Sequence, residues 1–408
     1  MTLMDKQFRI LFMSDNPRLI TGYANQTRNI CRRLARENWI DLHCLGVQNM
    51  GAPSYFIDKP FRLYSSPMEG AYKLWPAGRQ RWGEDVIQQY VKEEIKPDLL
   101  CVLLDSFMLH YMIDQRKYPR GMDLSPAKKL FYFPSDGTPL PVNTPVLFKR
   151  FEYLVAMAKW GQKQAIDQGF VNCEYIPHAI DESDFYKIHP AHRAALRQQW
   201  GIRPDTFVAL SVFRNQGRKM PSELLKAWKK FTADKNDDCL LLLHADPHDM
   251  ASPVDLPYMI KELGIEKSVR WTGMRFGRGF SVPELRGIYN MADIHTLSTS
   301  GEGFGIPIIE SMVCGVPNVL PDFTTPKELL AGNGLLAKVA TTITGQYNVE
   351  RGMVDTNSLA QQWQTYYDDR KLLKKHSQGG VKHVKKNYTW KTVYPLWQRL
   401  LKRISEED

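Results

Sequence analysis

The sequence has few of the features that mark secreted, membrane-spanning or zinc-binding proteins. Its 408 residues include six cysteines, which are scattered and form no C-x-x-C pair. This argues against a disulfide framework or a zinc site, and favours reduced, mostly buried thiols. No apolar run approaches the roughly 20 residues that span a bilayer, and Met1–Arg9 has no apolar signal core. These absences predict a cytoplasmic protein with no transmembrane segment.

Two further absences concern ligands. The chain contains no Asp-x-Asp, a pattern with which enzymes hold a metal-bound diphosphate, and no G-x-G-x-x-G dinucleotide fingerprint. His244, His248 and Asp249 are close in sequence around Pro247, and we interpret them as part of a loop after a strand. The sequence therefore predicts no metal site and no requirement for a cofactor.

Length and pattern indicate an α/β fold with two domains. A chain of 408 residues is too long for one ordinary core, and short apolar runs alternate with helical patterns throughout. Such alternation predicts a parallel sheet with helices on both faces, once in each half. The expected strands are Phe8–Met13, Leu42–Val47, Asp98–Leu104, Lys129–Phe133, Tyr153–Met157, Phe207–Val212, Cys239–His244, Val269–Thr272, Asp293–Leu297 and Pro317–Leu320; the expected helices include Thr21–Glu37 and Gly83–Glu94.

The most informative segment reads Glu-Gly-Phe-Gly-Ile-Pro-Ile-Ile-Glu, from Glu302 to Glu310. Its glycines allow a ligand to approach backbone N–H groups, and Pro307 suits the first turn of a helix. N–H groups at a helix start bind anions such as phosphate. Two carboxylates eight positions apart could then accept hydrogen bonds from two hydroxyl-bearing ends of one ligand. That ligand would be a nucleotide sugar; the alternative is a βα turn capped by Glu302, with Glu310 on a solvated face.

A basic loop follows the expected strand that ends at Val212. Arg214, Arg218 and Lys219 lie there before a helix opened by Ser222 and Glu223. Cations delivered to a βα loop could neutralise a leaving diphosphate. The alternative is that these side chains are only solvated. We expect Lys219 to lie in an exposed loop, so that the fold persists when this residue is replaced.

The order of motifs in the second half resembles the retaining glycosyltransferases of family 4, which have the GT-B architecture: two Rossmann-like doubly wound parallel-sheet domains facing across a cleft. The motifs that carry the resemblance are Trp271-Thr272-Gly273, Pro283-Glu284-Leu285, Tyr289-Asn290-Met291-Ala292-Asp293, the E-x7-E pair Glu302 and Glu310, and Cys314-Gly315-Val316-Pro317.

This resemblance implies roles for individual residues. Glu302 would contact the donor sugar and Glu310 the ribose of the nucleotide, while Arg214 and Lys219 would stabilise the diphosphate. The resemblance further implies that backbone groups at Phe304, Gly305 and Ile306 face the sugar and diphosphate, and that backbone at Met274 and Arg275 reads the base. The turn at Gly22 could approach the diphosphate, and an ordinary capped βα turn is the alternative there. The implied reaction is a metal-independent, retaining transfer from a nucleotide sugar such as a UDP-sugar to an acceptor hydroxyl.

Asp136 stands near the point where many members of the family have a histidine beside the donor sugar. It could hydrogen-bond a sugar or acceptor hydroxyl, and we count it as a candidate catalytic residue; a turn-forming Asp-Gly is the alternative. The segment Tyr175–Asp181 resembles the family's linker, although Ala179 replaces a common glycine. We therefore predict domains at residues 1–178, with the final helix 388–408 added, and 179–387.

The acceptor is the least determined part of the function. The net charge is +10, and basic clusters with aromatic neighbours suit a polyanionic acceptor, either nucleic acid bases or lipids of an anionic membrane. We favour nucleic acid, with lipid or a small soluble acceptor as alternatives; a noncatalytic nucleotide-sugar-binding protein and an NAD-dependent enzyme are rival classes. The clusters are Arg32, Arg33 and Arg36; Arg79 and Arg81 beside Trp75 and Trp82; and Lys371, Lys374, Lys375, Lys382, Lys385 and Lys386.

Overall fold

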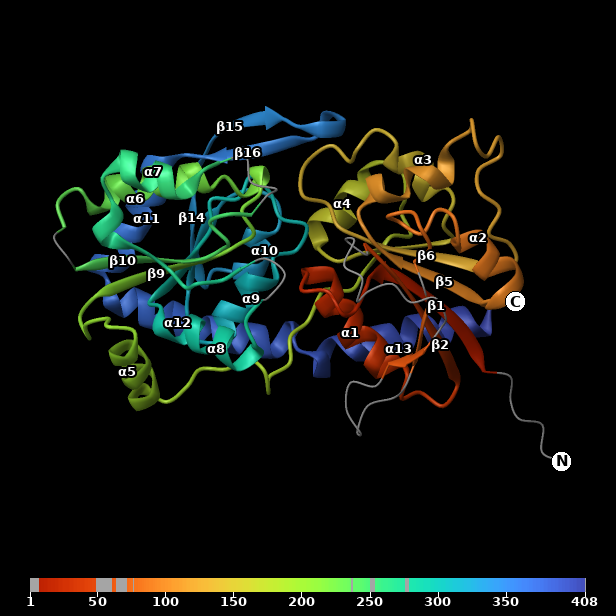
Figure 1. Cartoon of the computed structure of the whole chain (residues 1–408), viewed down its shortest axis with the longest axis horizontal. Coiled ribbons are helices and arrows are strands. Elements are labelled where there is room, and N and C mark those ends of the chain that lie inside the picture. Colours follow the sequence, from red (N-terminus) through yellow and green to blue (C-terminus); the bar gives the residue numbers. More distant parts are fainter. Residues whose placement is uncertain are drawn as a thin grey trace. The chain divides into compact units, whose positions relative to one another are not determined.

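The computed structural model describes residues 7–48, 61–63, 72–75, 77–235, 238–249, 254–275 and 279–407. The chain divides into two compact units (Figure 1). Unit 1 comprises Met1–Ser135, Pro139–Pro177 and Tyr394–Asp408, and unit 2 comprises Asp136–Thr138 and His178–Val393. The division after Pro177 lies one residue before the predicted boundary, and the last segment of unit 1 begins at 394 where we predicted 388.

Unit 1 is built on an eight-stranded sheet in the order β3-β4-β2-β1-β5-β6-β7-β8. All neighbouring strands are parallel except β3 and β4. The five strands expected in this half are present as β1, β2, β5, β6 and β7. The bounds are β1 Phe8–Asp15, β2 Ile40–Val47, β3 Phe61–Leu63, β4 Tyr72–Trp75, β5 Leu99–Leu103, β6 Lys128–Phe133, β7 Tyr153–Ala156 and β8 Glu174–Tyr175.

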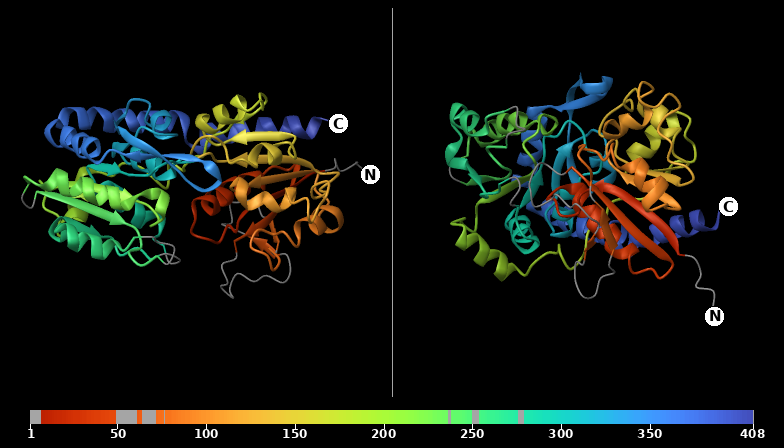
Figure 2. Two further views of the ribbon diagram at one scale, coloured as in Figure 1. Left: turned by 90° about the horizontal axis from the view of Figure 1, so that it is seen from above. Right: turned by 45° about the vertical axis from the view of Figure 1, so that its right-hand side comes forward.

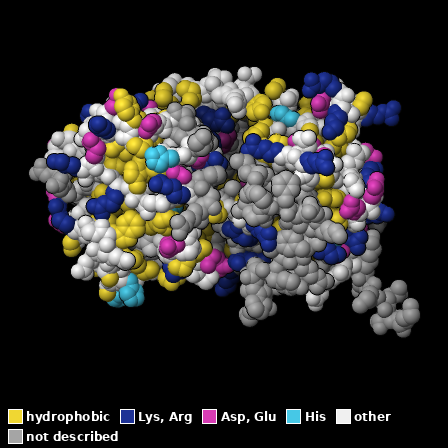
Figure 3. Space-filling view, in the orientation of Figure 1, with side chains coloured by type: hydrophobic (Ala, Val, Ile, Leu, Met, Phe, Trp, Pro, Cys, Tyr) yellow, Lys and Arg dark blue, Asp and Glu magenta, His cyan; other side chains and the backbone are white. Residues whose placement is uncertain are grey.

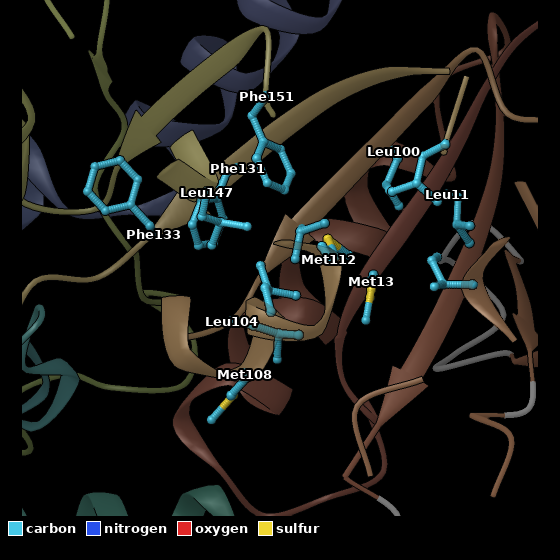
Figure 4. Packing of buried hydrophobic residues seen from close by; sticks show 14 of the residues in the cluster. Leu11, Met13, Leu100, Leu104, Met108, Met112, Phe131, Phe133, Leu147 and Phe151 are labelled. Carbon is cyan, nitrogen blue, oxygen red and sulfur yellow. The ribbon is translucent and has the colours of Figure 1, made fainter. Parts of the chain in front are cut away.

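Alternation along the buried strands of unit 1 divides its core between the two faces of the sheet. Leu11 and Met13 of β1 pack with Leu100 of β5 and Phe131 of β6 in one cluster (Figure 4). Side chains of a strand point alternately to opposite faces of the sheet. The residues that adjoin the cluster in sequence, such as Tyr132 beside Phe131, therefore pack on the opposite face. There Tyr132 meets Trp397 of the last helix edge to face, with ring centroids 5.0 Å apart.

Helices cover both faces of this sheet, with bounds α1 Gly22–Leu34, α2 Ile87–Gln89, η2 Tyr90–Glu94, η3 Ser106–Ile113, α3 Thr144–Phe148, α4 Lys159–Asp167 and α13 Trp390–Glu406. Thr21 caps α1 by accepting a hydrogen bond from the Ala24 N–H. The helix expected over Gly83–Glu94 is wrong in its first part. Gly83 has φ +77°, outside the right-handed helical region, and Val86 at φ −123° is not yet helical, so regular helix starts only at Ile87.

Unit 2 contains a six-stranded sheet in the order β11-β10-β9-β12-β13-β14, all parallel. Its bounds are β9 Phe207–Val212, β10 Cys239–His244, β11 Val269–Trp271, β12 Ile294–Thr296, β13 Asn318–Pro321 and β14 Gly334–Ala337. The five strands expected in this half are present, and β14 at the edge was not predicted. The α/β class and the two Rossmann-like domains predicted from the sequence are thus confirmed.

The helices of unit 2 form a layer on each side of its sheet (Figure 2). Helices α6, α7 and α11 lie on one side, and α8, α9 and α12 lie on the other. On the first side Trp228 and Trp363 pack edge to face, with ring centroids 5.6 Å apart. The bounds are α5 Pro190–Gln199, η4 Gly217–Lys219, α6 Pro221–Thr232, α7 Leu256–Leu263, η5 Glu266–Ser268, α8 Val282–Met291, α9 Ile306–Val313, α10 Pro326–Leu330, α11 Thr356–Asp368 and α12 Arg370–Asn387.

An antiparallel hairpin that the sequence did not predict follows β14. It consists of β15 Val339–Thr344 and β16 Glu350–Val354, with the short turn η6 Gln346–Asn348 between them. Thr138 forms an antiparallel bridge with Glu350, with N–H to carbonyl hydrogen bonds of 3.1 and 2.8 Å. The hairpin therefore holds residues 136–138 within unit 2.

The cysteines and the apolar segments agree with their predictions. All six cysteines are free and buried, as the scattered pattern indicated. Among the described residues, none of the helices combines the length and the apolar character needed to cross a bilayer.

Candidate active site

The topology of unit 2 brings the two motif loops together. Strands β9 and β12 are parallel neighbours, so the loops that follow them leave the same edge of the sheet. In open α/β sheets, ligands bind at that edge, outside the carboxyl ends of the strands. The loop after β9 carries Lys219, and the loop after β12 carries Glu302.

Backbone contacts fasten one loop to the other. The Ser298 hydroxyl donates to the carbonyl oxygens of Lys219 and Met220, at 2.9 and 2.7 Å. The Ser300 N–H donates to the Arg218 carbonyl at 2.8 Å. Met220 itself has φ +46°, a left-handed conformation that turns the chain from η4 into α6. The positions of the basic side chains are therefore set by the serine-rich approach to Glu302.

Lys219 and Glu302 form a buried ion pair at the centre of this arrangement. The Lys219 Nζ lies 2.5 Å from Glu302 Oε1, and the two side chains are 12% and 6% exposed. A guanidinium nitrogen of Arg218 lies 3.6 Å from Glu302 Oε2. We had expected Lys219 in an exposed loop, and that expectation is wrong. A short 3₁₀ turn folds its side chain inward, where the Glu302 carboxylate compensates the charge.

Burial and charge act in opposite directions on this pair. Burial would raise the pKa of Glu302, but the Lys219 and Arg218 cations outweigh it and hold that pKa below its ordinary value. Burial lowers the pKa of Lys219 to about 8, with Arg218 adding to the effect and Glu302 opposing it. Both groups are thus charged at neutral pH, and Lys219 lies close to its titration range.

Asp136 joins the same charged cluster from residues 136–138. Its Oδ1 accepts a hydrogen bond from Arg351 of β16 at 2.7 Å, and its Oδ2 lies 3.8 Å from Arg218 Nε. A Cβ on Gly301 would lie 1.8 Å from the Asp136 carbonyl oxygen, so this approach requires glycine there. The structure therefore places Asp136 beside the Lys219–Glu302 pair, held between two arginines.

Glu310 lies in the second turn of α9 and is 5% exposed. The Tyr289 hydroxyl of α8 donates to Glu310 Oε2 at 2.8 Å. Burial raises the pKa of Glu310 to about 7, and the hydrogen bond from Tyr289 opposes that rise. Glu310 is therefore a carboxyl group whose charge changes near neutral pH.

The start of α9 offers backbone donors between the two glutamates. Gly305 precedes the helix with φ +105°, which only glycine adopts without strain. The N–H groups of Phe304, Gly305 and Ile306 donate no backbone hydrogen bond within the described part of the chain. The Phe304 ring is buried against His178 and Tyr388, which fixes the turn. This geometry can bind an anion.

Other predicted site residues lie apart from this cluster or in contact with different partners. The Arg214 Nε donates a hydrogen bond of 2.8 Å to Asp249, which lies on the loop after β10. Asp246 lies on that same loop, and the exposed Arg275 approaches it to 3.6 Å. Met274, which precedes Arg275, is half-buried. Gly22 begins α1 in unit 1. Of the predicted residues, the structure thus brings together Lys219, Glu302 and Asp136.

Two contacting residues were missed by sequence reasoning. Arg351 lies beyond the motifs on an unpredicted hairpin, and nothing in its local sequence marks it. Tyr289 belongs to a motif of the sequence but was given no role there, although it lies on the helix that precedes the Glu302–Glu310 segment.

No group of three or more potential metal ligands occurs in the described part of the chain. The His244 ring forms a hydrogen bond with the Thr272 hydroxyl.

The two tryptophans of the basic and aromatic cluster before α2 differ in burial. Trp75 is buried, and its indole N–H donates to His43 Nδ1 at 2.8 Å. Trp82 is half-buried, with the Arg81 guanidinium 4.5 Å from its ring centre. On the face that Figure 3 shows, Lys and Arg side chains are scattered among hydrophobic and acidic ones.

Comparisons with known proteins agree with this geometry. Residues 192–345 match the family described as glycosyl transferases group 1, so unit 2 carries a glycosyltransferase domain. The match includes both motif loops and ends before Arg351. The D-inositol 3-phosphate glycosyltransferase 2 of Catenulispora acidiphila is 30% identical over 141 residues, 33% of this chain and 32% of that protein. The aligned part is thus about a third of that relative's length.

Solved structures resemble nearly the whole chain. Sucrose-phosphate synthase from Thermosynechococcus elongatus has a TM-score of 0.73 at 16% identity, covering 98% of this chain and 99% of that one. Anabaena HepE, solved with UDP and glucose, has a TM-score of 0.69 at 17% identity, covering 98% and 100%. At these identities the likeness shows the fold alone, and it confirms the predicted GT-B fold.

Proposed function

We propose that this protein is a retaining glycosyltransferase that moves a sugar from a nucleoside diphosphate sugar to an acceptor hydroxyl without a metal ion. The observation that carries the proposal is the buried Lys219–Glu302 pair, in the loop that leads into α9, the helix that carries Glu310. The group 1 glycosyltransferase match over the same loops supports it. That HepE was solved with UDP and glucose supports a UDP-sugar as donor.

In this proposal the charged groups divide the donor between them. Lys219, with the N–H groups at the start of α9, stabilises the departing diphosphate, because preorganised donors act where negative charge develops. Glu302 accepts hydrogen bonds from the sugar, and Glu310 accepts from the ribose. The acceptor hydroxyl attacks the anomeric carbon on the face that the diphosphate leaves, and a diphosphate oxygen takes the proton. The resemblance to family 4 supplies this scheme.

Three predicted contacts stay part of the proposal. Backbone at Met274 and Arg275 reads the base, the turn at Gly22 approaches the diphosphate, and Asp136 contacts a sugar or acceptor hydroxyl. Arg214 adds positive charge near the diphosphate while Asp249 holds its guanidinium. Since Arg351 and Arg218 both contact Asp136, that carboxylate is well placed to orient Arg218.

The acceptor we favour is a hydroxyl-bearing modified base of a nucleic acid, on the basis of the net charge of +10. A small phosphate-bearing acceptor is the second candidate, because a relative that matches 33% of this chain is named a D-inositol 3-phosphate glycosyltransferase. A membrane lipid acceptor and a noncatalytic nucleotide-sugar-binding role remain alternatives. A cytoplasmic location stays a prediction.

The direct test is incubation with a panel of nucleoside diphosphate sugars, with release of the nucleoside diphosphate as the readout. We expect release from one or a few donors, undiminished by EDTA, and transfer with retained anomeric configuration by NMR. Binding of a donor without release would favour the noncatalytic alternative. Neither binding nor release across the panel would overturn the proposal.

A further inference from the structure

Helix α12 presents a face with charge of one sign. The 18 residues from Arg370 to Asn387 include no Asp or Glu, and Asp369 just before them caps the helix by accepting from the Leu372 N–H. The opposite side, with Gly380 and Val384, is buried in unit 2. The exposed positions are Arg370, Lys371, Lys374, Lys375, Gln378, Lys382, Lys385 and Lys386, which we call the α12 basic face.

These positions fall on a single arc of the helix. At about 100° per residue they occupy roughly 160° of the circumference, over a length of roughly 24 Å. The buried residues of the helix, His376, Ser377, Gly380 and Val384, occupy the remainder. Figure 2 shows this helix among the blue elements along one side of unit 2. The cations therefore point outward together, not around the helix.

Little in the protein neutralises this face. The pairs Lys371/Lys375 and Lys382/Lys386 are like charges at i and i+4, each costing the helix about 0.2–0.5 kcal/mol. Lys385 lies 3.7 Å from Glu182. The other lysines of the face have no ion-pair partner among the described residues. An ordinary solvated helix mixes both signs, so this uniform charge indicates a polyanionic partner.

We propose that the α12 basic face binds the phosphate backbone of double-stranded nucleic acid. The arc contains one apolar residue, the half-buried Val381, and no aromatic one, and the exposed large hydrophobic residues lie elsewhere in the chain. Helices that lie on membranes add such residues as anchors, which disfavours a lipid surface. A half-circumference of cations fits phosphates on both sides of a groove about 12 Å wide, into which a helix about 10–12 Å across can lie.

This inference deepens the proposed function and rests on it for its purpose, because it would hold a base-bearing acceptor on unit 2. The binding itself needs no donor. Each phosphate neutralised contributes about −0.9 to the slope of log affinity against log salt. Five lysines without partners therefore predict a slope of up to about −4 to −5.

The test is fluorescence anisotropy with a labelled DNA duplex of roughly 20 bp, about two helical turns, across a salt series and without nucleotide sugar. The variant is Lys374→Glu with Lys382→Glu, two of the five lysines without partners, on either side of the middle of the arc. The matched control is Lys229→Glu with Lys267→Glu, two exposed lysines of unit 2 outside α12. Both variants change the net charge equally. Thermal melting checks folding, and Lys374→Gln with Lys382→Gln replaces the first variant if it does not fold.

We expect the wild type to bind with a steep salt dependence. The α12 variant should lose at least about tenfold in affinity at low salt, and its slope should fall by about 2, one phosphate contact for each lysine; the control should stay near wild type. Equal losses in both variants would reduce the effect to net charge and overturn the proposal. So would absence of DNA binding, whether or not the protein pellets with phosphatidylserine vesicles. A protein that binds DNA but releases no nucleoside diphosphate would refute the proposed function and leave this surface intact.

Discussion

Replacing Lys219 by methionine tests whether the Lys219 cation stabilises the departing diphosphate. Methionine keeps much of the side chain's length but removes the cation, so the departing diphosphate loses one preorganised charge donor. Turnover should fall by about 10²–10³-fold, the usual effect of such a loss. The assay is steady-state release of nucleoside diphosphate from the preferred donor.

The same change also has a cost in stability, because Glu302 is 4% exposed. Removing one partner of a buried ion pair costs about 3–5 kcal/mol, as it leaves an uncompensated charge. Arg218 remains 3.6 Å from the carboxylate, so we expect a loss near 3 kcal/mol, the lower end of that range. Urea unfolding measures this free energy. We had expected the fold to be indifferent to Lys219, and its burial corrects that.

The matched control is the double variant Lys219→Met with Glu302→Gln. Replacing a buried ion pair by neutral groups of similar volume is often close to neutral, so most of the lost stability should return. Turnover should not return, since both donor contacts are gone. If turnover recovers together with stability, the single variant was merely misfolded, and the role of Lys219 at the diphosphate is refuted. Wild-type turnover in a folded single variant would refute it as well.

Four further predictions follow from the site. Turnover should fall as pH rises through about 8, where Lys219 loses its proton; a flat profile from pH 7 to 9 would contradict this. Because the folded state raises the pKa of Glu310 from 4.5 to about 7, its burial destabilises the fold increasingly as pH rises between those values. Glu310→Gln should therefore unfold at higher urea than wild type at pH 8 but not at pH 5, while binding UDP more weakly. Tyr289→Phe removes a hydrogen bond that lowers the pKa of Glu310, so the pH midpoint for UDP binding should move upward; an unchanged midpoint in calorimetry would exclude that role. Gly301→Ala would place a Cβ 1.8 Å from the Asp136 carbonyl and should lower both melting temperature and turnover, whereas Gly287→Ala in α8, where a Cβ would make only ordinary van der Waals contact with Leu196 at 3.7 Å, should leave turnover unchanged.

Much of the fold could be predicted because buried parallel strands are short continuous apolar runs. Strands such as Leu99–Leu103 and Cys239–His244 stand out on that basis alone. The edge strand Gly334–Ala337 and the hairpin 339–354 do not: the edge strand is an apolar run of only four residues and is largely half-buried, and the first strand of the hairpin is largely exposed and rich in threonine. The failed start of the helix at Gly83 depended on a positive φ that a sequence does not reveal.

The candidate site was predictable to the extent that it lies in one loop. Glu302, Gly305 and Glu310 are fixed by their spacing around a helix start. The burial of Lys219 was not predictable, because it depends on a carboxylate 83 residues away that approaches through the pairing of β9 with β12. Contacts between elements distant in sequence require the strand order, which the pattern of apolar runs does not determine.

The most direct test of the central claim, that residues 302–310 bind a nucleoside diphosphate sugar, is calorimetry with free UDP. Glu310→Ala should weaken UDP binding by about tenfold or more, the value of one charge-assisted hydrogen bond of about 1.5–3 kcal/mol. Glu302→Gln should leave UDP binding nearly intact while lowering transfer from the nucleotide sugar. Equal losses of UDP affinity in the two variants, or no UDP binding by the wild type, would contradict the account.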